Sequence, residues 1–278
     1  MNNCADEDQQ LSGTPPYAKS AVDREGKQWR DGMPHDTSVI EAFLEFNSVL
    51  LSDLLAIAEE TAASLLLPLK PGAAPVVLPN SDTYVFSARV KTEETLLQKL
   101  RRMRKTPLLN VQDVAGLRFD CSLTLSQQTK VAEAFSNAFV VAGANRVDIR
   151  DLREGSHSGY RAVHLHIRSS LGRAEMQIRS SLQSKWANLY EEAADIYGRE
   201  IRYLHEADVG VPAGAGRIVQ DLHALSNRVK EVEELVDNGS PSAESDISTL
   251  EPDLYGTLDS IHKSLRANRP KATDRSRG

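Results

Sequence analysis

Alternating apolar and polar residues near the middle of the chain give the clearest structural signal. The run GYRAVHLHIRSSLGRAEMQIRS spans residues 159–180. Because successive side chains of a strand point to opposite faces, it predicts two strands joined by a turn around Gly172. With the turn centred near Leu171, His164 is expected opposite Gln177. One face is apolar and predicted to face the core; it carries Val163, Leu165, Ile167, Ala174, Met176 and Ile178.

The opposite face of this hairpin carries chemically varied side chains. They are Tyr160, His164, His166, Glu175, Gln177 and Arg179. A sheet face that only meets water rarely needs an aromatic ring, two imidazoles, a carboxylate, an amide and a guanidinium, so this face predicts a site. The two histidines alone are explained equally by an ordinary half-buried pair. A metal pair is less favoured, because the pattern shows no third ligand.

The run VAGLRFDCSL at residues 114–123 predicts another strand. Leu117, Phe119, Cys121 and Leu123 alternate towards the core, whereas Arg118 and Asp120 share the other face. Shorter strands are predicted at Tyr84–Phe86 and near Arg146–Leu152. About five strands are therefore expected.

Apolar residues at three- and four-residue spacing predict the helices. The first begins at Ser38, with Glu41 completing a capping box, and ends before Pro68. Others are predicted from Thr92, over Ser126–Ala138 and over residues 180–200, where Trp186 is assigned to the core. In the helix from Thr92, the buried side carries Leu96, Leu100 and Met103. Two C-terminal amphipathic stretches carry Ile218, Leu222, Leu225, Val229, Val232 and Leu235, and then Leu254, Leu258, Ile261 and Leu265.

These elements predict an α+β (mixed α/β) fold, a mixed sheet of about five strands flanked by helices, with a C-terminal helical extension. Residues 1–36 are polar and expected to be disordered. Residues 37–205 are expected to form the main domain. The helical extension covers residues 206–265, with a linker at 238–248, and packs on the domain or on a second subunit. Residues 266–278 form a basic tail that is expected to be disordered.

Composition narrows the class of protein. The chain has 278 residues and a net charge of −6, which argues against a general nucleic-acid coat. Its two cysteines, Cys4 and Cys121, cannot form a disulfide framework and favour a reducing compartment. No apolar run approaches membrane-spanning length, and the N-terminus has no signal-peptide core. A cytoplasmic protein with no membrane partner is expected.

Cationic residues nevertheless crowd one segment. Seven lie between Arg89 and Lys105, and Lys99 and Arg102 share an exposed helix face. A solvated helix face is the ordinary explanation of such a run. In an acidic chain, this concentration favours a polyphosphate site.

Five ordered motifs resemble the synthetase domain of the RelA/SpoT alarmone synthetases. They are SARVK followed by Lys99 and Arg102, then QDVAGLRF, SGYRAVHL, AEMQIRS and Trp186-Ala187, and the resemblance covers about residues 38–205. It implies a nucleotidyltransferase-like sheet and transfer of pyrophosphate from ATP to the ribose 3′-hydroxyl of GDP or GTP. The 37 upstream residues leave no room for the hydrolase domain of the long enzymes, so a small synthetase is expected.

The resemblance implies a role for each matching residue. Asp113 and Glu175 would hold Mg²⁺, with Glu175 also acting as the base. Arg89 and Arg118 would stack on the adenine of ATP, and the acceptor would contact Tyr160, His164 and Gln177. Lys91, Lys99 and Arg102 would hold the triphosphate. By strand parity Asp113 falls on the face opposite Arg118; a bulge at Ala115-Gly116 would reconcile this, and Asp120 is the alternative metal ligand.

Two departures from the family pattern lie on the acceptor side. A lysine four residues before the tyrosine is replaced by Ser156, which leaves Arg153 and Arg150 as the nearest cations. An asparagine two residues before the tryptophan is replaced by Ser184. These departures leave an alternative function open, that of a toxin that pyrophosphorylates the 3′ CCA end of tRNA or makes adenosine alarmones. Such a toxin would imply tRNA and an antitoxin as partners. A catalytically silent nucleotide-binding module is a third reading. Homo-oligomerisation through the C-terminal helices is also expected.

Overall fold

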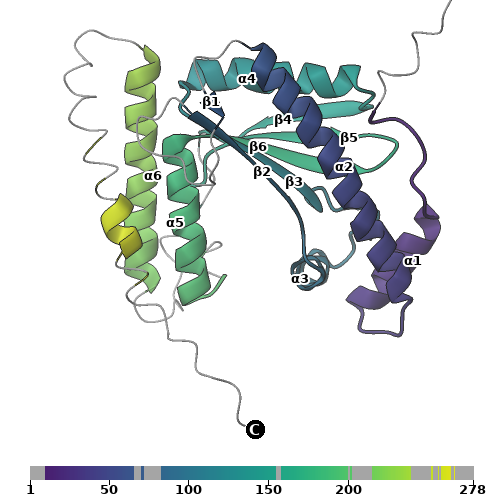
Figure 1. The fold of residues 1–278 in the computed structure, drawn as a ribbon. Helices are drawn as coiled ribbons and strands as arrows, with labels where there is room; N and C mark the ends of the chain where they lie inside the picture. The colour runs from purple at the N-terminus through teal and green to yellow at the C-terminus, as the bar shows by residue number, and fades with distance from the viewer. Residues whose placement is uncertain are drawn as a thin grey trace, which may run out of the picture.

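One mixed sheet with helices on both sides organises the computed structural model (Figure 1). The structure describes residues 10–65, 70–71, 83–154, 158–199, 201, 215–238, 252, 256, 258–263 and 266. The helices are α1 Lys19–Arg30, α2 Thr37–Ser64, α3 Glu93–Met103, the 3-10 turn η1 Leu108–Asn110, α4 Leu125–Val141, α5 Ser181–Tyr197 and α6 Ala215–Asn238. The strands are β1 Lys70–Pro71, β2 Thr83–Val90, β3 Ala115–Cys121, β4 Arg146–Asp151, β5 Val163–Arg168 and β6 Arg173–Ser180.

The strands follow the order β1-β2-β3-β6-β5-β4. β3 runs parallel to β6, whereas β2, β5 and β4 each run antiparallel to a neighbour. The predicted mixed α+β sheet is therefore confirmed, and the sixth strand is the two-residue β1. β3 and β6 lie at the centre of the sheet, so the side chains that they carry are surrounded by other strands.

The hairpin β5–β6 has the predicted register. His164 pairs with Gln177, and the turn between the strands contains Leu171 and Gly172. The apolar face is buried as predicted, with Leu165, Met176 and Ile178 fully covered. α2 and α4 cover this face (Figure 1) and contribute Leu54, Phe135 and other side chains to the same core.

Several predicted details of the helices and strands are wrong or incomplete. α2 begins at Thr37 and its cap is Asp36, whose carboxylate accepts from the Ser38 backbone N–H, so Glu41 does not complete a capping box. Met103 is 36% exposed, not buried, because it is the last residue of α3. β2 extends through Val90 because it pairs with β3 from Tyr84 to Val90.

The prediction that residues 1–36 are disordered is also wrong for the described part of that segment. α1 lies there, and Leu11 and Val22 are fully buried while Trp29 is nearly so. The segment is polar overall, but its few apolar residues pack against α2, α3 and the η1 turn. α1 therefore supports the chain just before β3.

α6 packs along α5 and forms a second apolar cluster with it (Figure 1). Leu222, Leu225 and Val229 are buried there, and Trp186 is in the core as predicted, donating its indole N–H to the Leu222 carbonyl at 2.7 Å. Of the second amphipathic stretch, Leu258 is buried in the same cluster. Most of the predicted linker at 238–248, and residues 267–278 of the tail, lie outside the described residues. None of the described helices is long and apolar enough to cross a membrane.

Candidate active site

A polar cavity of about 690 Å³ lies where β2, β3 and β6 meet α3 and α5. Five cationic side chains predicted to bind ATP line it together with the two carboxylates predicted to bind metal. These seven residues are Arg89, Lys91, Lys99, Arg102, Arg118, Asp113 and Glu175. They come from segments up to 86 positions apart in sequence, and the sheet register brings them to one place. Their roles in binding and catalysis remain predictions.

One row across the sheet forms part of the cavity wall. Arg89 pairs with Gly116, Gly116 with Glu175, and Glu175 with His166. Gly116 contributes no side chain, so the row is open between the arginine and the carboxylate. A Cβ there would meet only the Arg89 carbonyl oxygen, at 3.4 Å, so the backbone around this position has room for a Cβ.

Asp113 lies in the turn before β3 and holds two lysines. Its carboxylate contacts Lys91 at 3.0 Å and Lys99 at 2.5 Å. The predicted bulge at Ala115-Gly116 is wrong, because the ladder on both sides of β3 is unbroken there. Strand parity does not apply to a residue outside the strand. Asp113 therefore reaches the cavity from the turn.

Glu175 is half-buried and surrounded by donors. Gln177 donates to one carboxylate oxygen at 2.8 Å, and His164 Nδ1 and His166 Nε2 lie 3.5 and 3.4 Å from the two oxygens. Burial alone raises the pKa of this carboxyl, but the hydrogen bonds from His166 and Gln177 and the imidazole charges outweigh it and lower the pKa to about 2. Glu175 is therefore ionised throughout the neutral range.

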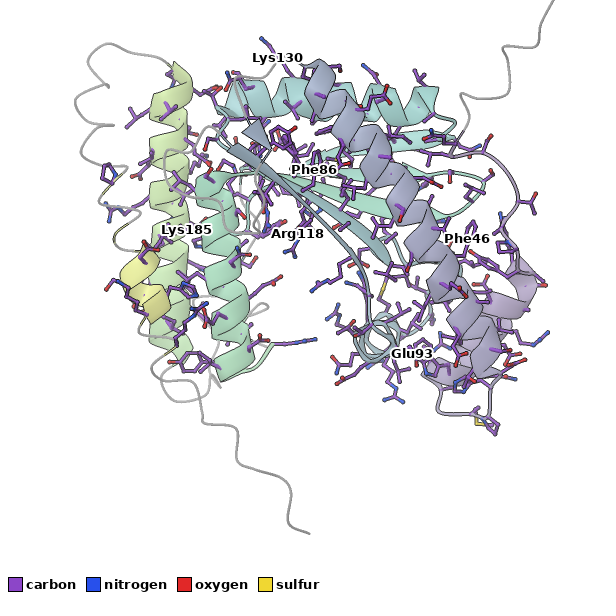
Figure 2. The ribbon with its side chains drawn as sticks, in the orientation of Figure 1. Phe46, Phe86, Glu93, Arg118, Lys130 and Lys185 are labelled. Atoms are coloured by element: carbon purple, nitrogen blue, oxygen red, sulfur yellow. The ribbon has the colours of Figure 1, made fainter. Side chains whose placement is uncertain are left out.

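Arg89 and Arg118 are diagonal neighbours on the same sheet face. Ser87 pairs with Arg118 while Arg89 pairs with Gly116. Diagonal residues of antiparallel strands are roughly 7–8 Å apart. That spacing is between backbone positions; a flat ring stacked between two guanidinium planes needs the planes about 7 Å apart, twice the van der Waals contact distance of ~3.5 Å. Arg118 lies on the side of the sheet that faces α5 (Figure 2), 3.6 Å from Glu191.

The residues predicted to bind the acceptor form a hydrogen-bonded chain. The Tyr160 hydroxyl lies 2.9 Å from His164 Nε2 and 3.4 Å from the Gln177 amide oxygen. Burial raises the pKa of Tyr160 to about 12, so its hydroxyl stays protonated. Gln177 lines the cavity, whereas Tyr160 and His164 are not among its described lining residues. The structure thus brings the three together but presents only Gln177 to the cavity.

Asp120, the alternative metal ligand, is engaged elsewhere. It is buried and accepts from Arg179 at 2.9 and 3.1 Å and from Ser184 at 2.7 Å. Arg179, which the sequence places on the polar face of the hairpin, is therefore the buried partner of Asp120 and not a surface charge. Ser184, where the family pattern has asparagine, completes this buried pair. Asp120 is not among the described residues that line the cavity.

The possible substitutes for the missing acceptor lysine differ in position. Arg153 is held by Asp151 and by the Leu125 carbonyl, beside α4 and away from the cavity. Arg150 is exposed and pairs with His164 in the β4–β5 register, so it projects on the same sheet face. Ser156 lies outside the described residues. Arg150 is thus the better placed cation of the two.

Sequence reasoning missed the part of the cavity wall that α5 and the residues just after it contribute. Glu191, Asp195 and Arg199 line it, spaced four apart. Arg199 donates to Gln98 of α3 at 3.0 Å and so links the end of α5 to α3. The four-residue spacing was a usable signal, because it places polar residues on one side of a helix.

The predicted Mg²⁺ has suitable oxygen donors here. Mg²⁺ sites commonly use one or two protein carboxylates, with water and substrate phosphates completing the coordination. Asp113 and Glu175 line the same cavity, and Glu175 is held ionised. At Asp113, an ion would compete with Lys91 and Lys99 for the carboxylate. The donor set fits the ion.

Comparisons with known proteins find similarity over a large part of the chain. Residues 88–201 match the family model described as a region found in RelA / SpoT proteins. Uncharacterised proteins of Mycobacterium tuberculosis and Mycobacterium bovis are 37% identical over 195 residues, 69% of this chain and 64% of theirs. The chain therefore matches less than two thirds of their length. The crystal structure of small alarmone synthetase 1 from Bacillus subtilis has the same fold, with a TM-score of 0.51 and 22% identity over 71% of this chain and 95% of that chain.

Proposed function

Residues 88–201 match the region found in RelA / SpoT proteins, and from this premise we propose that the chain is a member of that family and transfers pyrophosphate from ATP to the ribose 3′-hydroxyl of GDP or GTP. The observation that carries the proposal is the cavity, where five cationic side chains surround two carboxylates on one side of the sheet. Pyrophosphoryl transfer needs such a combination, because charge moves between phosphate oxygens while an acceptor hydroxyl must be oriented.

The donor ATP fits the β2–α3 side of the cavity. Arg89 and Arg118 have the diagonal spacing for a stacked adenine, and guanidinium groups suit stacking because they are planar and always charged. Lys91, Lys99 and Arg102 then bind the triphosphate. In this proposal the phosphates take over the lysines that now contact Asp113, which frees that carboxylate.

The acceptor ribose lies against Glu175 and Gln177. The 3′-hydroxyl oxygen attacks the β-phosphorus of ATP, its proton passes to Glu175, and AMP leaves. A carboxylate with a pKa of about 2 is a weak base. Phosphoryl-type transfers have loose transition states in which positioning and charge stabilisation dominate. Glu175 therefore acts chiefly by holding the hydroxyl with a hydrogen bond and accepts the proton late.

Asp113 and Glu175 would hold the Mg²⁺, which supplies charge neutralisation at the donor phosphates when bound. The protein's own residues orient the two substrates. Tyr160 and His164 support Gln177 and Glu175 from the side away from the cavity.

The experiment is a transfer assay with γ-labelled ATP and Mg²⁺, offering GDP, GTP, ADP and deacylated tRNA separately. Label is expected on GDP or GTP. Label on tRNA alone would replace the guanine-nucleotide acceptor by the tRNA 3′ end, and label on ADP alone would replace it by an adenine nucleotide. Absence of transfer to all four would contradict the proposal and leave a binding module.

Variants test which carboxylates act. Asp113→Asn and Glu175→Gln are each expected to lower kcat by at least about 100-fold, the scale of losing one group that acts in the transition state. Glu41→Gln, at an exposed carboxylate of α2, is the matched control. Full activity in Glu175→Gln would remove Glu175 from its assigned role.

A further inference from the structure

His164, His166 and Glu175 form a compact group at the edge of the cavity. Each offers one ligand atom, and these atoms lie within 4.8 Å of one another. Among the described residues, this is the one group of three histidine, cysteine or carboxylate side chains with that property. The sequence showed a histidine pair without a third ligand; β6 supplies the third by pairing Glu175 directly with His166.

The spacing matches that of a tetrahedral metal site. Ligand bonds of about 2.0–2.1 Å at tetrahedral angles place neighbouring ligand atoms roughly 3.4 Å apart. His164 Nδ1 and His166 Nε2 lie 3.5 and 3.4 Å from the Glu175 oxygens. The two imidazoles face different oxygens of Glu175, and the three ligand atoms lie within 4.8 Å of one another, so a shift of these side chains brings all three around one ion.

Hydrogen bonds already fix the direction of two of these ligands. His164 Nε2 is bonded to the Tyr160 hydroxyl, which leaves Nδ1 directed at Glu175. Tyr160 in turn donates to the Gln177 oxygen, and the Gln177 amide donates to Glu175. Metal-binding histidines and carboxylates are typically held by such outer partners. Asp148 of β4 pairs with His166 in the strand register, but its carboxylate contacts Arg146 and Arg168.

We propose that His164, His166 and Glu175 bind a zinc-type divalent cation, separate in chemistry from the Mg²⁺ of the proposed reaction. Imidazole nitrogens suit Zn²⁺, whereas Mg²⁺ strongly prefers oxygen ligands. Three protein ligands leave a fourth position for water or a phosphate oxygen. Because Glu175 also lines the cavity, the ion lies at its edge and shares this carboxylate with the proposed reaction.

The test is a calorimetric titration of the full, metal-free chain with Zn²⁺ in excess Mg²⁺, with no nucleotide present. One equivalent is expected to bind. His166→Ala and Glu175→Gln should each weaken binding by more than about 100-fold, since losing an outer partner alone costs 10–100-fold. Titration with Co²⁺ should give the visible absorption of a four-coordinate ion in the wild type and lose it in both variants.

Two controls distinguish binding at this site from zinc binding by other histidines and from loss of binding through unfolding. His35→Ala removes a histidine in the turn before α2 and should bind Zn²⁺ like the wild type. Thermal melts of the metal-free proteins check that the variants are folded. Absence of a stoichiometric site, or equal affinity in folded His166→Ala, would overturn the proposal. Because no nucleotide is used, either result is independent of whether the transfer assay succeeds.

Discussion

At the scale of single residues, the charges buried around the site are paired through long-range contacts. Arg179 and Asp120 are 59 positions apart and both nearly inaccessible. A charge removed from water is costly unless it is paired and hydrogen-bonded. Their bidentate contact on neighbouring strands β3 and β6 therefore has to form whenever the sheet forms.

Asp120→Asn is expected to lower the free energy of unfolding by roughly 3 kcal/mol, because it leaves the Arg179 charge buried without a counter-charge. Urea denaturation measures the change, with Glu41→Gln as an exposed control. A loss below about 1 kcal/mol would show that water reaches Arg179.

Glu233 on α6 gives a pH-dependent prediction. Burial raises the pKa of this carboxyl above 4.5, even though Ser180 and Gln183 donate to it. A raised carboxyl pKa means that the folded state binds the proton more tightly, so the contribution to stability is full below pH 4.5 and is lost as the pH rises through the raised pKa.

Glu233→Gln does not titrate, so its stability relative to the wild type should rise as the pH increases from 4.5 through the raised pKa of Glu233, by ~1.4 kcal/mol for each unit of raised pKa. Urea midpoints of both proteins across this range provide the measurement. A constant difference between the two curves would show that the carboxyl titrates normally.

The sequence predicted more of the candidate site residues than of the buried residues that hold them in position. His164 opposite Gln177, and Glu175 on the polar face, followed from alternation and turn position alone. The Arg179–Asp120 pair could not be predicted, because it depends on β3 and β6 being neighbours. Asp113 was assigned from the resemblance while parity pointed elsewhere, since parity carries no information about a turn.

At the scale of elements, α1 and η1 brace the segment that carries Asp113. The Leu109 backbone donates to Asp23 of α1 at 3.1 Å, and Leu108 is buried against the same helix. Their closest approach is at Gly26, where a Cβ would lie 2.7 Å from the Leu108 Cβ. A glycine is needed there for packing, despite its low helix propensity.

Gly26→Ala is therefore expected to destabilise the fold by about 1–3 kcal/mol, although alanine favours a helix by up to about 1 kcal/mol. Gly172→Ala is the control, because its Cβ would meet only the end of the Leu50 side chain, at 3.3 Å. The comparison uses urea midpoints. Stabilisation by Gly26→Ala would show that α1 can shift away from η1 without cost.

α1 escaped sequence prediction for a physical reason. Its sequence KSAVDREGKQWR contains only two large apolar residues, Val22 and Trp29, among charged ones. A helix with so narrow an apolar side is indistinguishable from a polar tail until its partners α2 and α3 are known. By contrast, the hairpin strands and α6 have patterns strong enough to be predicted without partners.

At the scale of the whole molecule, the cavity is bordered by separately packed regions. The main core lies between the sheet and helices α2 and α4, the second apolar cluster joins α5 and α6, and a third joins α1, α3 and the start of α2. α6 is tied to the β5 side as well, because buried Arg161 donates to Ser226 and Asn227. The C-terminal helix predicted from its apolar spacing is thus integral to this chain's core.

Truncation after residue 204 should remove more than about 5 kcal/mol of stability. It exposes the α5 side of the cluster and leaves Arg161 and the Trp186 indole without their acceptors. That loss is comparable with the whole stability of many domains, so no cooperative urea transition is expected.

Truncation after Asn238 keeps α6 and loses the contacts of Leu258 and Ile261, so a loss of only about 2–4 kcal/mol is expected. Equal midpoints for the chain truncated after residue 204 and the full chain would mean that α6 contributes nothing to folding.

The absence of a side chain at Gly116 allows the shape of the cavity to be changed without changing the charged groups that line it. The strand is regular there, and a small side chain would touch only one carbonyl oxygen. A leucine at this position would plug the space between Arg89 and Glu175 while every ionic group stays in place. A folded variant with this cavity filled would keep the surface charge but not bind nucleotide inside. Comparing it with the wild type would distinguish nucleotide bound in the cavity from nucleotide attracted to the charged surface.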